Sequence, residues 1–489
     1  MITIVDIGSS NLNSIVNMIK KIGARAEVSS QPEQILKADK IILPGVGAYD
    51  NGMRNLERLG LIGALKHKVL EEEIPILGIC LGMQLLMEGS EEGRLPGLGW
   101  IQGRAVKFDF GSNQQRLKIP NMGWNVVSPR PGLVSLFAGL RVPPRFYFVH
   151  SYHCQCARSE DILATSHHGL DFVCALNRGN IYGTQFHPEK SHRFGMRLLR
   201  NFVELDPEGC NSTIDGALAR LEVADGAAGW SQSETNRKTR VIPSLLLKGQ
   251  GFVKTRKFKS PTYLGDPINI VKIFNDKEVD EIIILDITAT RKGKRPNFEL
   301  LKDIAGECFM PLGYGGGIQS IEDIRKLFSL GFEKAVCNTL AIENPSFLKE
   351  ASDRFGSQSI VASIDVRRSF LGRSEVYTCC GTKNTRLDPV EVAHRMEQMG
   401  AGEILLNSVD RDGTMTGYDL NLIKRLADAV NIPVVACGGA GKVEDFRDAV
   451  NGSGASAVAA GSFFVFQGKH RAVLINMPTA EELDQLSLP

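Results

Sequence analysis

Residues 310–318 read MPLGYGGGI, and residues 432–440 read IPVVACGGA. Pro311 and Pro433 lie 122 residues apart, and the same offset places EIIILD (281–286) on EILLNS (403–408) and AVCNT (335–339) on AVAAG (457–461). Three matches in one register indicate an internal repeat. Two similar halves within about 240 residues of alternating strand and helix patterns predict an eight-stranded (βα) barrel, a TIM barrel built from two half-barrels. A doubly wound open sheet is the alternative.

The composition describes a globular protein of two or three domains, with 489 residues of which 43% are apolar and 23% charged. A net charge of +2 indicates no surface for nucleic acid, so the expected partners are small molecules or proteins. The opening MITIVDIGSS lacks the features of a secretion signal, and no apolar run approaches ~20 residues, so we expect a cytoplasmic protein without membrane contact. The ten cysteines show neither a disulfide framework nor metal-ligand spacing, and we expect no metal and no cofactor.

Changes of pattern divide the chain into four parts. Over residues 1–205, short apolar runs alternate with helical patterns, as in an α/β domain. Residues 206–239 lose this periodicity and gain Gly, Ala, Ser and Asn, which predicts a linker. The alternation resumes in residues 240–476, the predicted barrel, and residues 477–489 are predicted to form a C-terminal tail.

A nucleophile is predicted in IPILGICLGMQLLME (74–88), where Cys80 stands between Gly78 and Gly82. An apolar run precedes the cysteine and a helical pattern follows it. The glycines permit a sharp turn, and a helix start lowers the pKa of a thiol and offers the N–H of Leu81 to an oxyanion. A buried structural cysteine is the alternative, but it needs no glycine two residues away on each side.

A base and its orienting carboxylate are predicted in YGTQFHPEKS (182–191). His187 ends a predicted strand and Glu189 follows two residues later, so that Cys, His and Glu complete a proton relay. A chance placement among nine histidines is the alternative. A second glycine turn, LPGVGAY (43–49), can supply the other oxyanion N–H from Val46 or Gly47.

These motifs, with NMGWN (121–125) and FVHSY (148–152), resemble the class I glutamine amidotransferases, in particular the glutaminase of imidazole glycerol phosphate synthase. The resemblance covers nearly all of residues 1–205 and implies a doubly wound, flavodoxin-like domain. It implies that Cys80 attacks the side-chain amide of glutamine, forms a thioester and releases ammonia to a partner barrel. The glutamine-binding positions that it implies are Gly45, Gln84, His150, Ser151 and Tyr152.

The turns GYGGGI and ACGGAG fall at the predicted carboxyl ends of barrel strands, where backbone N–H groups can approach an anion. One turn in each half predicts two phosphate sites and a ligand with a phosphate at each end; tight turns without a ligand are the alternative. Residues 240–476 also resemble the cyclase subunit of the same synthase, through motifs such as CNTLAIENP and DRDGTMTGYDL. The expected phosphate-binding residues are Gly316, Gly317, Asn338, Thr339, Gly413, Gly438, Gly439 and Gly461.

The same resemblance matches Arg240, Glu281, Lys334 and Glu403 to the charged ring that gates the lower mouth of the cyclase barrel, where ammonia enters. Glu281 and Glu403 are repeat mates at strand starts, and paired charges there would otherwise be an unusual burial. A structural salt-bridge cluster is the alternative.

The cyclase uses two aspartates, at the ends of its first and fifth strands, as acid and base. Asp365 in ASIDVR matches one of them, but Leu246 in IPSLLLKGQG stands at the position of the other. Leucine cannot transfer a proton, and the loss of one partner typically costs about 10²–10⁴-fold in rate. Gly461 and Val465 depart from the last phosphate loop of the cyclase.

These departures resemble a branch of cyclase-like barrels that accompany amidotransferases making acetamidino groups on bacterial surface sugars. The resemblance favours ammonia supply to a separate sugar amidotransferase. A complete imidazole glycerol phosphate synthase of histidine biosynthesis is the first alternative. A barrel that serves only as a docking module is the second alternative. The presence of Asp365, Asp286 and both glycine turns argues against it, because a docking module would not need them.

Overall fold

The computed structural model of the chain describes residues 1–8, 12–111, 117–131, 136–140, 143–205, 239–369, 372–468, 471–479 and 482–483. The chain divides into two compact units, Met1–Leu117 with Trp124–Arg237 and Lys118–Gly123 with Lys238–Pro489. The predicted linker, residues 206–239, lies outside the described residues except for Thr239, and so does most of the predicted tail, residues 477–489. Among the described residues, no helix is both long and apolar enough to span a membrane.

Parallel strands form one part of the sheet in the first unit, in the order β2, β1, β3, β4 and β12. Strands β11, β10, β7 and β8 extend the sheet beyond β12, and β5, β6 and β9 branch from it. Every residue of β4 is buried, as expected of a strand that is covered on both faces. The strands are β1 (Ile2–Val5), β2 (Ala26–Ser29), β3 (Lys40–Gly45), β4 (Ile76–Cys80), β5 (Met87–Ser90), β6 (Ile101–Lys107), β7 (Asn121–Pro129), β8 (Arg145–His150), β9 (Tyr152–Cys156), β10 (Ile162–His167), β11 (Asp171–Arg178) and β12 (Ile181–Thr184).

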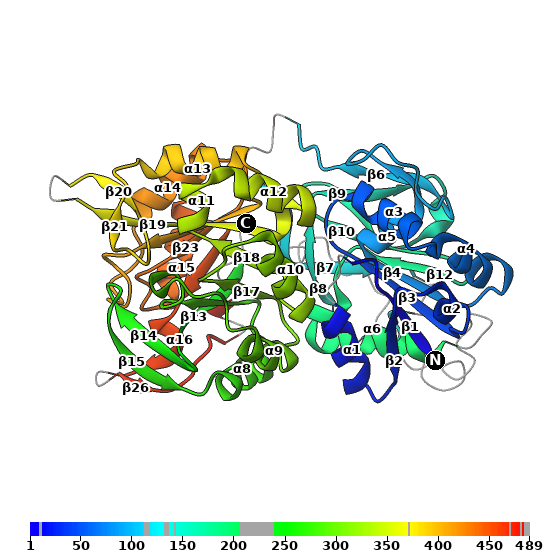
Figure 1. Cartoon of the computed structure of the whole chain (residues 1–489), viewed down its shortest axis with the longest axis horizontal. Helices are drawn as coiled ribbons and strands as arrows, with labels where there is room; N and C mark the ends of the chain where they lie inside the picture. The colour runs from blue at the N-terminus through cyan, green and yellow to red at the C-terminus, as the bar shows by residue number, and fades with distance from the viewer. Residues whose placement is uncertain are drawn as a thin grey trace. The chain divides into compact units, whose positions relative to one another are not determined.

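Helices cover both faces of this sheet (Figure 1). Helix α1 contacts α6, whereas α3 contacts α4 and α5. The apolar faces of α3, α4 and α5 pack with the strands β3 and β4 in a core in which Leu43, Leu56 and Met83 are fully buried. The helices are α1 (Leu12–Lys21), α2 (Pro32–Ile35), α3 (Tyr49–Arg58), α4 (Leu61–Lys66), α5 (Leu81–Leu85) and α6 (His192–Glu204).

Eight parallel strands close into a barrel in the second unit, because β24 pairs with β13 as well as with β23. Their inward side chains fill the barrel with small and branched residues such as Ile242, Val361 and Leu405. The predicted fold class, an α/β domain followed by a (βα)8 TIM barrel, is confirmed. The barrel strands are β13 (Arg240–Lys248), β16 (Ile282–Asp286), β17 (Leu312–Gly315), β18 (Lys334–Cys337), β19 (Ile360–Arg368), β22 (Glu403–Ser408), β23 (Val434–Cys437) and β24 (Ala457–Ala460).

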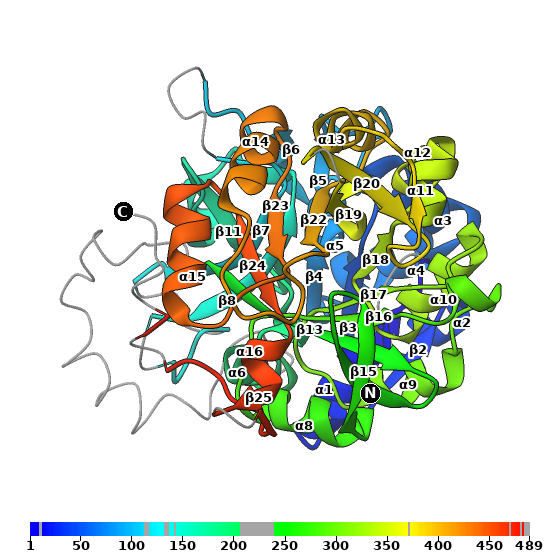
Figure 2. The ribbon, with the colours of Figure 1, turned by 90° about the vertical axis from the view of Figure 1, so that its left-hand side faces the viewer.

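A ring of helices surrounds the barrel strands (Figure 2). Several of these helices begin at a side chain that accepts a hydrogen bond from a free backbone N–H, as Asp266, Ser320 and Asp388 do. Such caps mark where each loop ends and its helix starts. The helices are α8 (Pro267–Asp276), α9 (Phe298–Gly306), α10 (Ile321–Leu330), α11 (Thr339–Glu343), α12 (Pro345–Phe355), α13 (Pro389–Gln398), α14 (Leu420–Ala429), α15 (Val443–Arg447) and α16 (Ser462–Val465).

Two of the barrel strands are followed by antiparallel hairpin strands before their helix begins. After β13 come β14 (Gly251–Arg256) and β15 (Lys259–Gly265), and after β19 come β20 (Ser374–Thr378) and β21 (Lys383–Asn384). Strands β13 and β19 are the first strands of the two repeat halves, so the hairpins occupy equivalent places. Both lie at the carboxyl ends of the barrel strands, where a TIM barrel carries its chemistry.

Candidate functional sites

Strand β4 ends at Cys80 with a φ of 55° and a ψ of −108°, which residues with a side chain rarely adopt. The neighbouring glycines make this turn possible. A Cβ at Gly82 would lie 1.8 Å from the carbonyl oxygen of Leu43, and a Cβ at Gly78 would lie 2.8 Å from backbone atoms of Gly82. The turn therefore holds Cys80 at the carboxyl edge of the parallel strands, directly before helix α5.

The glycine turn after β3 packs against the start of α5. Gly45 and Cys80 are register partners, and a Cβ at Gly45 would lie 3.0 Å from the Cβ of Leu81. Gly47 has a φ of 101°, which glycine adopts without strain. Because the first N–H groups of a helix have no partner within it, the N–H of Leu81 is available beside the thiol, and the turn that carries Val46 and Gly47 packs against the same helix start.

His187 follows β12, which pairs in parallel with β4, so this histidine reaches the same edge of the sheet. Its Nδ1 lies 2.7 Å from Oε1 of Glu189, and both side chains are buried. Burial alone would lower the pKa of His187, but the negative charges of Glu189 and Cys80 outweigh it and hold that pKa well above its usual value. Nε2 has no hydrogen-bond partner among the described residues and is therefore the nitrogen that can exchange a proton with the thiol.

Two glutamine side chains connect α5 to the Cys80 sulfur. Gln84 donates to Oε1 of Gln185 and to the carbonyl of Tyr152, each at 3.1 Å. Gln185 in turn donates to the Cys80 sulfur at 3.7 Å. Nδ1 of His150 lies 2.8 Å from the same Tyr152 carbonyl, and burial lowers the pKa of His150 to about 3, so this ring is neutral at physiological pH.

Four buried charges close the amino-terminal end of the barrel. Arg240, Lys334 and Glu403 begin strands β13, β18 and β22, Glu281 directly precedes β16, and each side chain is at most 1% exposed. Arg240 donates to Glu281 at 2.7 Å and to Glu403, and Lys334 donates to both glutamates at 2.8 to 2.9 Å. Each charge therefore has two opposite partners. Burial would raise the pKa of Glu403, but Arg240 and Lys334 outweigh it and hold that pKa below its usual value.

A cavity of about 350 Å³ opens at the other end of the barrel, among the carboxyl ends of the strands. Both glycine turns line it and require glycine: a Cβ at Gly316 would lie 2.4 Å from the carbonyl oxygen of Asp286, and one at Gly439 would lie 2.2 Å from that of Gly417. The amide of Asn338 donates to the Ser363 carbonyl at 3.0 Å. All the predicted phosphate-binding residues line this cavity: Gly316, Gly317, Asn338, Thr339, Gly413, Gly438, Gly439 and Gly461.

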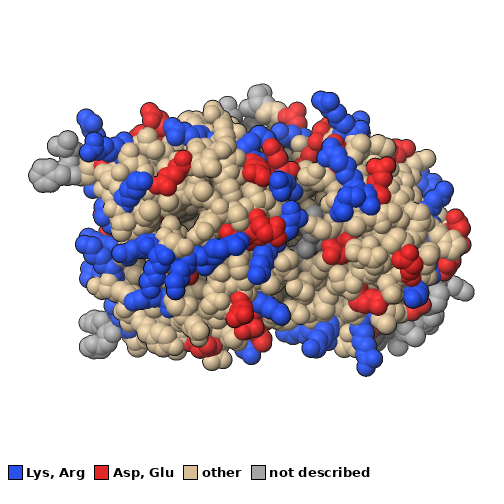
Figure 3. All heavy atoms as spheres, viewed as in Figure 1, with Lys and Arg blue, Asp and Glu red and all other residues tan. Residues whose placement is uncertain are grey.

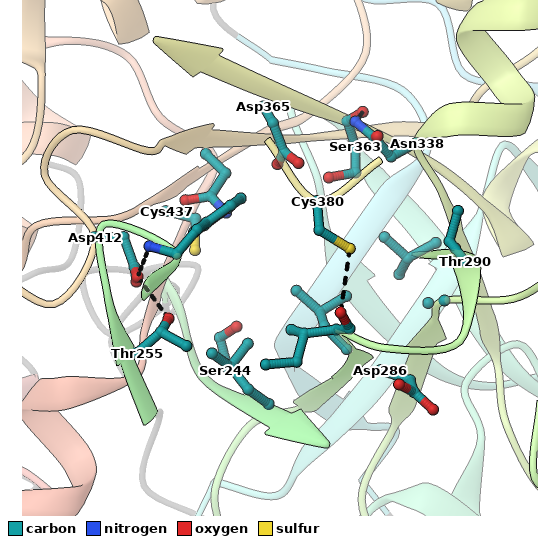
Figure 4. A pocket seen from close by; sticks show the side chains of 18 of the residues that line it. Ser244, Thr255, Asp286, Thr290, Asn338, Ser363, Asp365, Cys380, Asp412 and Cys437 are labelled. Carbon is teal, nitrogen blue, oxygen red and sulfur yellow. Dashed lines mark hydrogen bonds between the residues drawn. The ribbon is translucent and has the colours of Figure 1, made fainter. Parts of the chain in front are cut away.

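Leu246 and Asp365 both line this cavity, each largely buried. Burial raises the pKa of Asp365 to about 7, against a hydrogen bond from Asn407 that lowers it. Near neutral pH this carboxyl can therefore both give and take a proton. Figure 4 shows Asp365 and Asp412 on different sides of the cavity, with Cys380 between the loops. Leu246 contributes no titratable group.

Comparisons with known proteins match each unit to a family. Residues 3–205 match the family described as glutamine amidotransferase class-I, and residues 240–471 match the family described as histidine biosynthesis protein. The imidazole glycerol phosphate synthase hisHF of Arabidopsis thaliana, described as chloroplastic, is 31% identical over 95% of this chain and 86% of its own length. The chain belongs to the family of two-domain imidazole glycerol phosphate synthases.

Single-domain relatives match each half of this synthase family member more closely. A putative imidazole glycerol phosphate synthase subunit hisF2 of Pseudomonas aeruginosa is 53% identical over 50% of the chain and 98% of its own length. The subunit HisH 2 of Methanococcus maripaludis is 52% identical over 42% of the chain and 99% of its own length. The chain thus joins in one polypeptide what these relatives carry as separate subunits.

Two residues beside the amidotransferase site of this family member were missed by sequence reasoning. Gln185 bridges Gln84 and Cys80, and Glu92 accepts a hydrogen bond from the backbone of Tyr49 at 2.9 Å. Burial raises the pKa of Glu92 to about 7. Burial, with a smaller contribution from the charge of Glu92, raises the pKa of Tyr152. Glu92 lies in an acidic stretch that is typical of solvated surface, so nothing in the local sequence indicates that it lies beside the site.

The ion pair of Lys254 and Asp412 in the synthase barrel was also missed. Nζ of Lys254 lies 2.6 Å from Asp412, which also accepts from the Thr255 hydroxyl at 2.9 Å and so ties strand β14 to the loop after β22. A Cβ at Gly461 would lie 2.8 Å from Cε of Lys254, so this glycine makes room for the lysine. Val465 is buried in the core and does not line the cavity.

Basic side chains gather on the barrel unit of this family member, in a band that Figure 3 shows plainly. Two exposed groups contribute, one from the β14–β15 hairpin and one from the loop after β16, and both adjoin residues that line the cavity. They favour an anionic ligand, although the net charge of the chain is near zero. The residues are Arg256, Lys257, Lys259, Arg291, Lys292 and Lys294.

The Gly82→Ala variant is expected to lose glutaminase activity about 10²-fold or more, because the added methyl group forces the Leu43 carbonyl and the Cys80 turn apart. Gly63→Ala is the matched control, since a Cβ there meets nothing within 4 Å in helix α4. The control is expected to keep full activity and to gain about 0.5–1 kcal/mol of stability. Glutamate release measures activity; equal rates in both variants would contradict the role of Gly82.

The Glu403→Ala variant is expected to lower the stability of the protein by about 3–5 kcal/mol, because it leaves Arg240 and Lys334 buried with one partner in place of two. Glu343→Ala is the control: its ion pair with Lys383 is exposed and contributes about 1 kcal/mol or less. Calorimetry compares the unfolding temperatures. A loss no larger than that of the control would show that the ring contributes little to stability.

Proposed function

We propose that the first unit hydrolyses glutamine to glutamate and ammonia at Cys80. The sulfur attacks the side-chain amide carbon while Nε2 of His187 takes the thiol proton, and Glu189 holds the ring in the required orientation. The carbon–nitrogen bond then breaks as His187 returns the proton to the leaving ammonia. Water attacks the resulting thioester, giving up a proton to His187 that passes back to the Cys80 sulfur.

The observation that carries this proposal is the buried pair of His187 and Glu189 beside the strained cysteine turn. The charges of Glu189 and Cys80 favour the protonated imidazole, which is the state that follows proton transfer from the thiol. The converging N–H groups at Leu81 and at Val46 or Gly47 suit the oxyanion that forms twice in the reaction. The residues Gly45, Gln84, His150, Ser151 and Tyr152 are proposed to bind glutamine.

The charged ring is proposed to be the gate through which ammonia enters the barrel. Its four side chains occupy the amino-terminal mouth, so passage requires at least one of their ion pairs to part. The ring is neutral as a whole, with two positive and two negative charges. A neutral closure with internal partners can reopen and reform without leaving a net charge buried.

The cavity at the opposite end is proposed to hold a phosphorylated ligand. Two glycine turns, one from each half of the barrel, supply backbone that can approach a phosphate closely, and basic residues stand near the mouth. The spacing of two turns around one cavity suits an elongated ligand with a phosphate at each end.

The acceptor of the ammonia has two candidates. The relatives that match both units are named imidazole glycerol phosphate synthase, which supports cyclisation of the ribulosyl precursor within the barrel, as in histidine biosynthesis. The sequence motifs alone favour the other candidate, ammonia supply to a separate sugar amidotransferase. That candidate now stands second, because neither relative is named for sugar modification. It rests on Leu246, which removes one group of the acid–base pair.

The Cys80→Ala variant is expected to lose all measurable glutaminase activity and to keep its fold, because no other group can form the thioester. Glutamate release measures the activity, and circular dichroism checks the fold. Glutaminase near the level of the unmodified protein would remove Cys80 from its role. The control is Cys174→Ala: this thiol is buried in β11 and has no place in the proposed reaction.

Purified protein supplied with ammonium and the ribulosyl precursor is expected to form imidazole glycerol phosphate about 10²–10⁴-fold more slowly than a synthase that has both aspartates. Leu246→Asp is expected to recover part of the rate, since burial of the new carboxylate raises its pKa. Leu285→Asp, which adds a carboxylate at the neighbouring strand, is the control.

The outcomes separate the two candidates. Measurable cyclisation by the unmodified protein would support the histidine candidate, and a rate equal to that of a two-aspartate synthase would show that Asp365 suffices. Complete absence of product from the unmodified protein, with glutaminase intact, would favour a separate acceptor. Equal recovery by Leu246→Asp and Leu285→Asp would contradict a specific role for position 246.

A further inference from the structure

The two halves of the barrel present different chemistry at equivalent places. In the first half, Leu246 of β13 is the register partner of Leu285 of β16. In the second half, Asp365 of β19 is the register partner of Asn407 of β22. All four side chains line the cavity. At this level of the cavity, the pair from the first half therefore forms an apolar wall and the pair from the second half a polar wall.

The side chain of Asn407 is unusual within this polar wall. It is 5% exposed, and its Oδ1 has no hydrogen-bond partner among the described residues. This oxygen is buried, and a Cβ at Gly438 would lie 2.9 Å from it, so the second glycine turn passes directly beside it. The Asn407 amide is already engaged with Asp365. Buried acceptors in folded proteins are nearly always paired, so an unpaired one at a cavity wall points to a donor that arrives with a ligand.

We propose that Asn407 is a specificity-determining residue of the cavity, which with Asp365 receives a hydrogen-bond donor of the phosphorylated ligand while Leu246 and Leu285 receive a part without hydrogen-bonding groups. The inference rests on the proposed phosphorylated ligand. The donor is an N–H or O–H group, because Oδ1 can only accept. The ligand class is thus an elongated phosphate ester whose middle is polar on one side and apolar on the other.

The difference between the apolar and the polar wall can set the direction in which the ligand binds. The two glycine turns are equivalent in the two halves, so their backbone alone gives a ligand with two phosphates no preferred direction. The layer of Leu246, Leu285, Asp365 and Asn407 differs between the halves and therefore sets the direction. A reversed ligand would leave its donor against leucine and the Asn407 oxygen unpaired, and both losses oppose binding.

Binding of the ribulosyl precursor without ammonium, measured by calorimetry on the full chain, tests the proposal. Asn407→Leu makes the second wall resemble the first and is expected to weaken binding by about tenfold. Asn407→Thr introduces a hydroxyl that can donate to Asp365 and accept from the ligand, and is expected to stay within about threefold of the unmodified protein. Gly306→Ala, at the end of helix α9 where a Cβ meets nothing within 4 Å, is the control and is expected to bind as the unmodified protein does.

A second measurement distinguishes positioning from mere packing. Carbon-13 NMR of labelled aspartate reports the pKa of Asp365, which should rise above about 7 in Asn407→Leu because a hydrogen bond that lowers it is lost, and return in Asn407→Thr. Equal affinity in all variants would overturn the inference and leave the proposed ligand class intact. Failure of the unmodified protein to bind the precursor would overturn both, since Asn407 would then have no such ligand to orient.

Discussion

Four charged side chains at the amino-terminal end of the barrel are buried away from water: Arg240, Glu281, Lys334 and Glu403. Each charge is stable in the interior because two opposite charges lie within hydrogen-bond reach. This arrangement demands that four strands begin at one level. Parallel pairing then fixes which residues stand at the far ends of the same strands, because a slip of one residue would turn every side chain to the other face. The register of the barrel strands therefore sets the positions of both the charged ring and the residues that line the cavity.

The two sites obtain their reactivity from opposite physical causes. In the first unit, charges placed around His187 overcome the effect of burial and stabilise its protonated form. In the barrel, burial is the dominant influence on Asp365 and raises its pKa toward neutrality. A proton relay needs the first arrangement because it must separate charge; a lone carboxyl that both gives and takes a proton needs the second.

Sequence reasoning located the barrel, the cysteine turn and the His187–Glu189 pair because each depends on local pattern or on a repeat. The glycines at 78 and 82 are interpretable from their spacing around Cys80, since a sharp turn with close backbone contacts is what requires them. The pairing of Lys254 with Asp412, by contrast, spans 158 residues and joins a hairpin to a loop. Gln185 and Glu92 are ordinary polar residues until the fold places them, so no local pattern distinguishes them.

Because of the internal repeat, the two halves of the barrel share one arrangement of strands and turns. Both halves keep the same strand lengths at their glycine turns and the same hairpin after their first strand, whereas the layer above the strands has diverged. A duplicated half that keeps its backbone contacts can change those few terminal side chains at little cost to packing. The substrate that the barrel accepts can therefore change through these few side chains, while the backbone contacts that hold the barrel together stay the same.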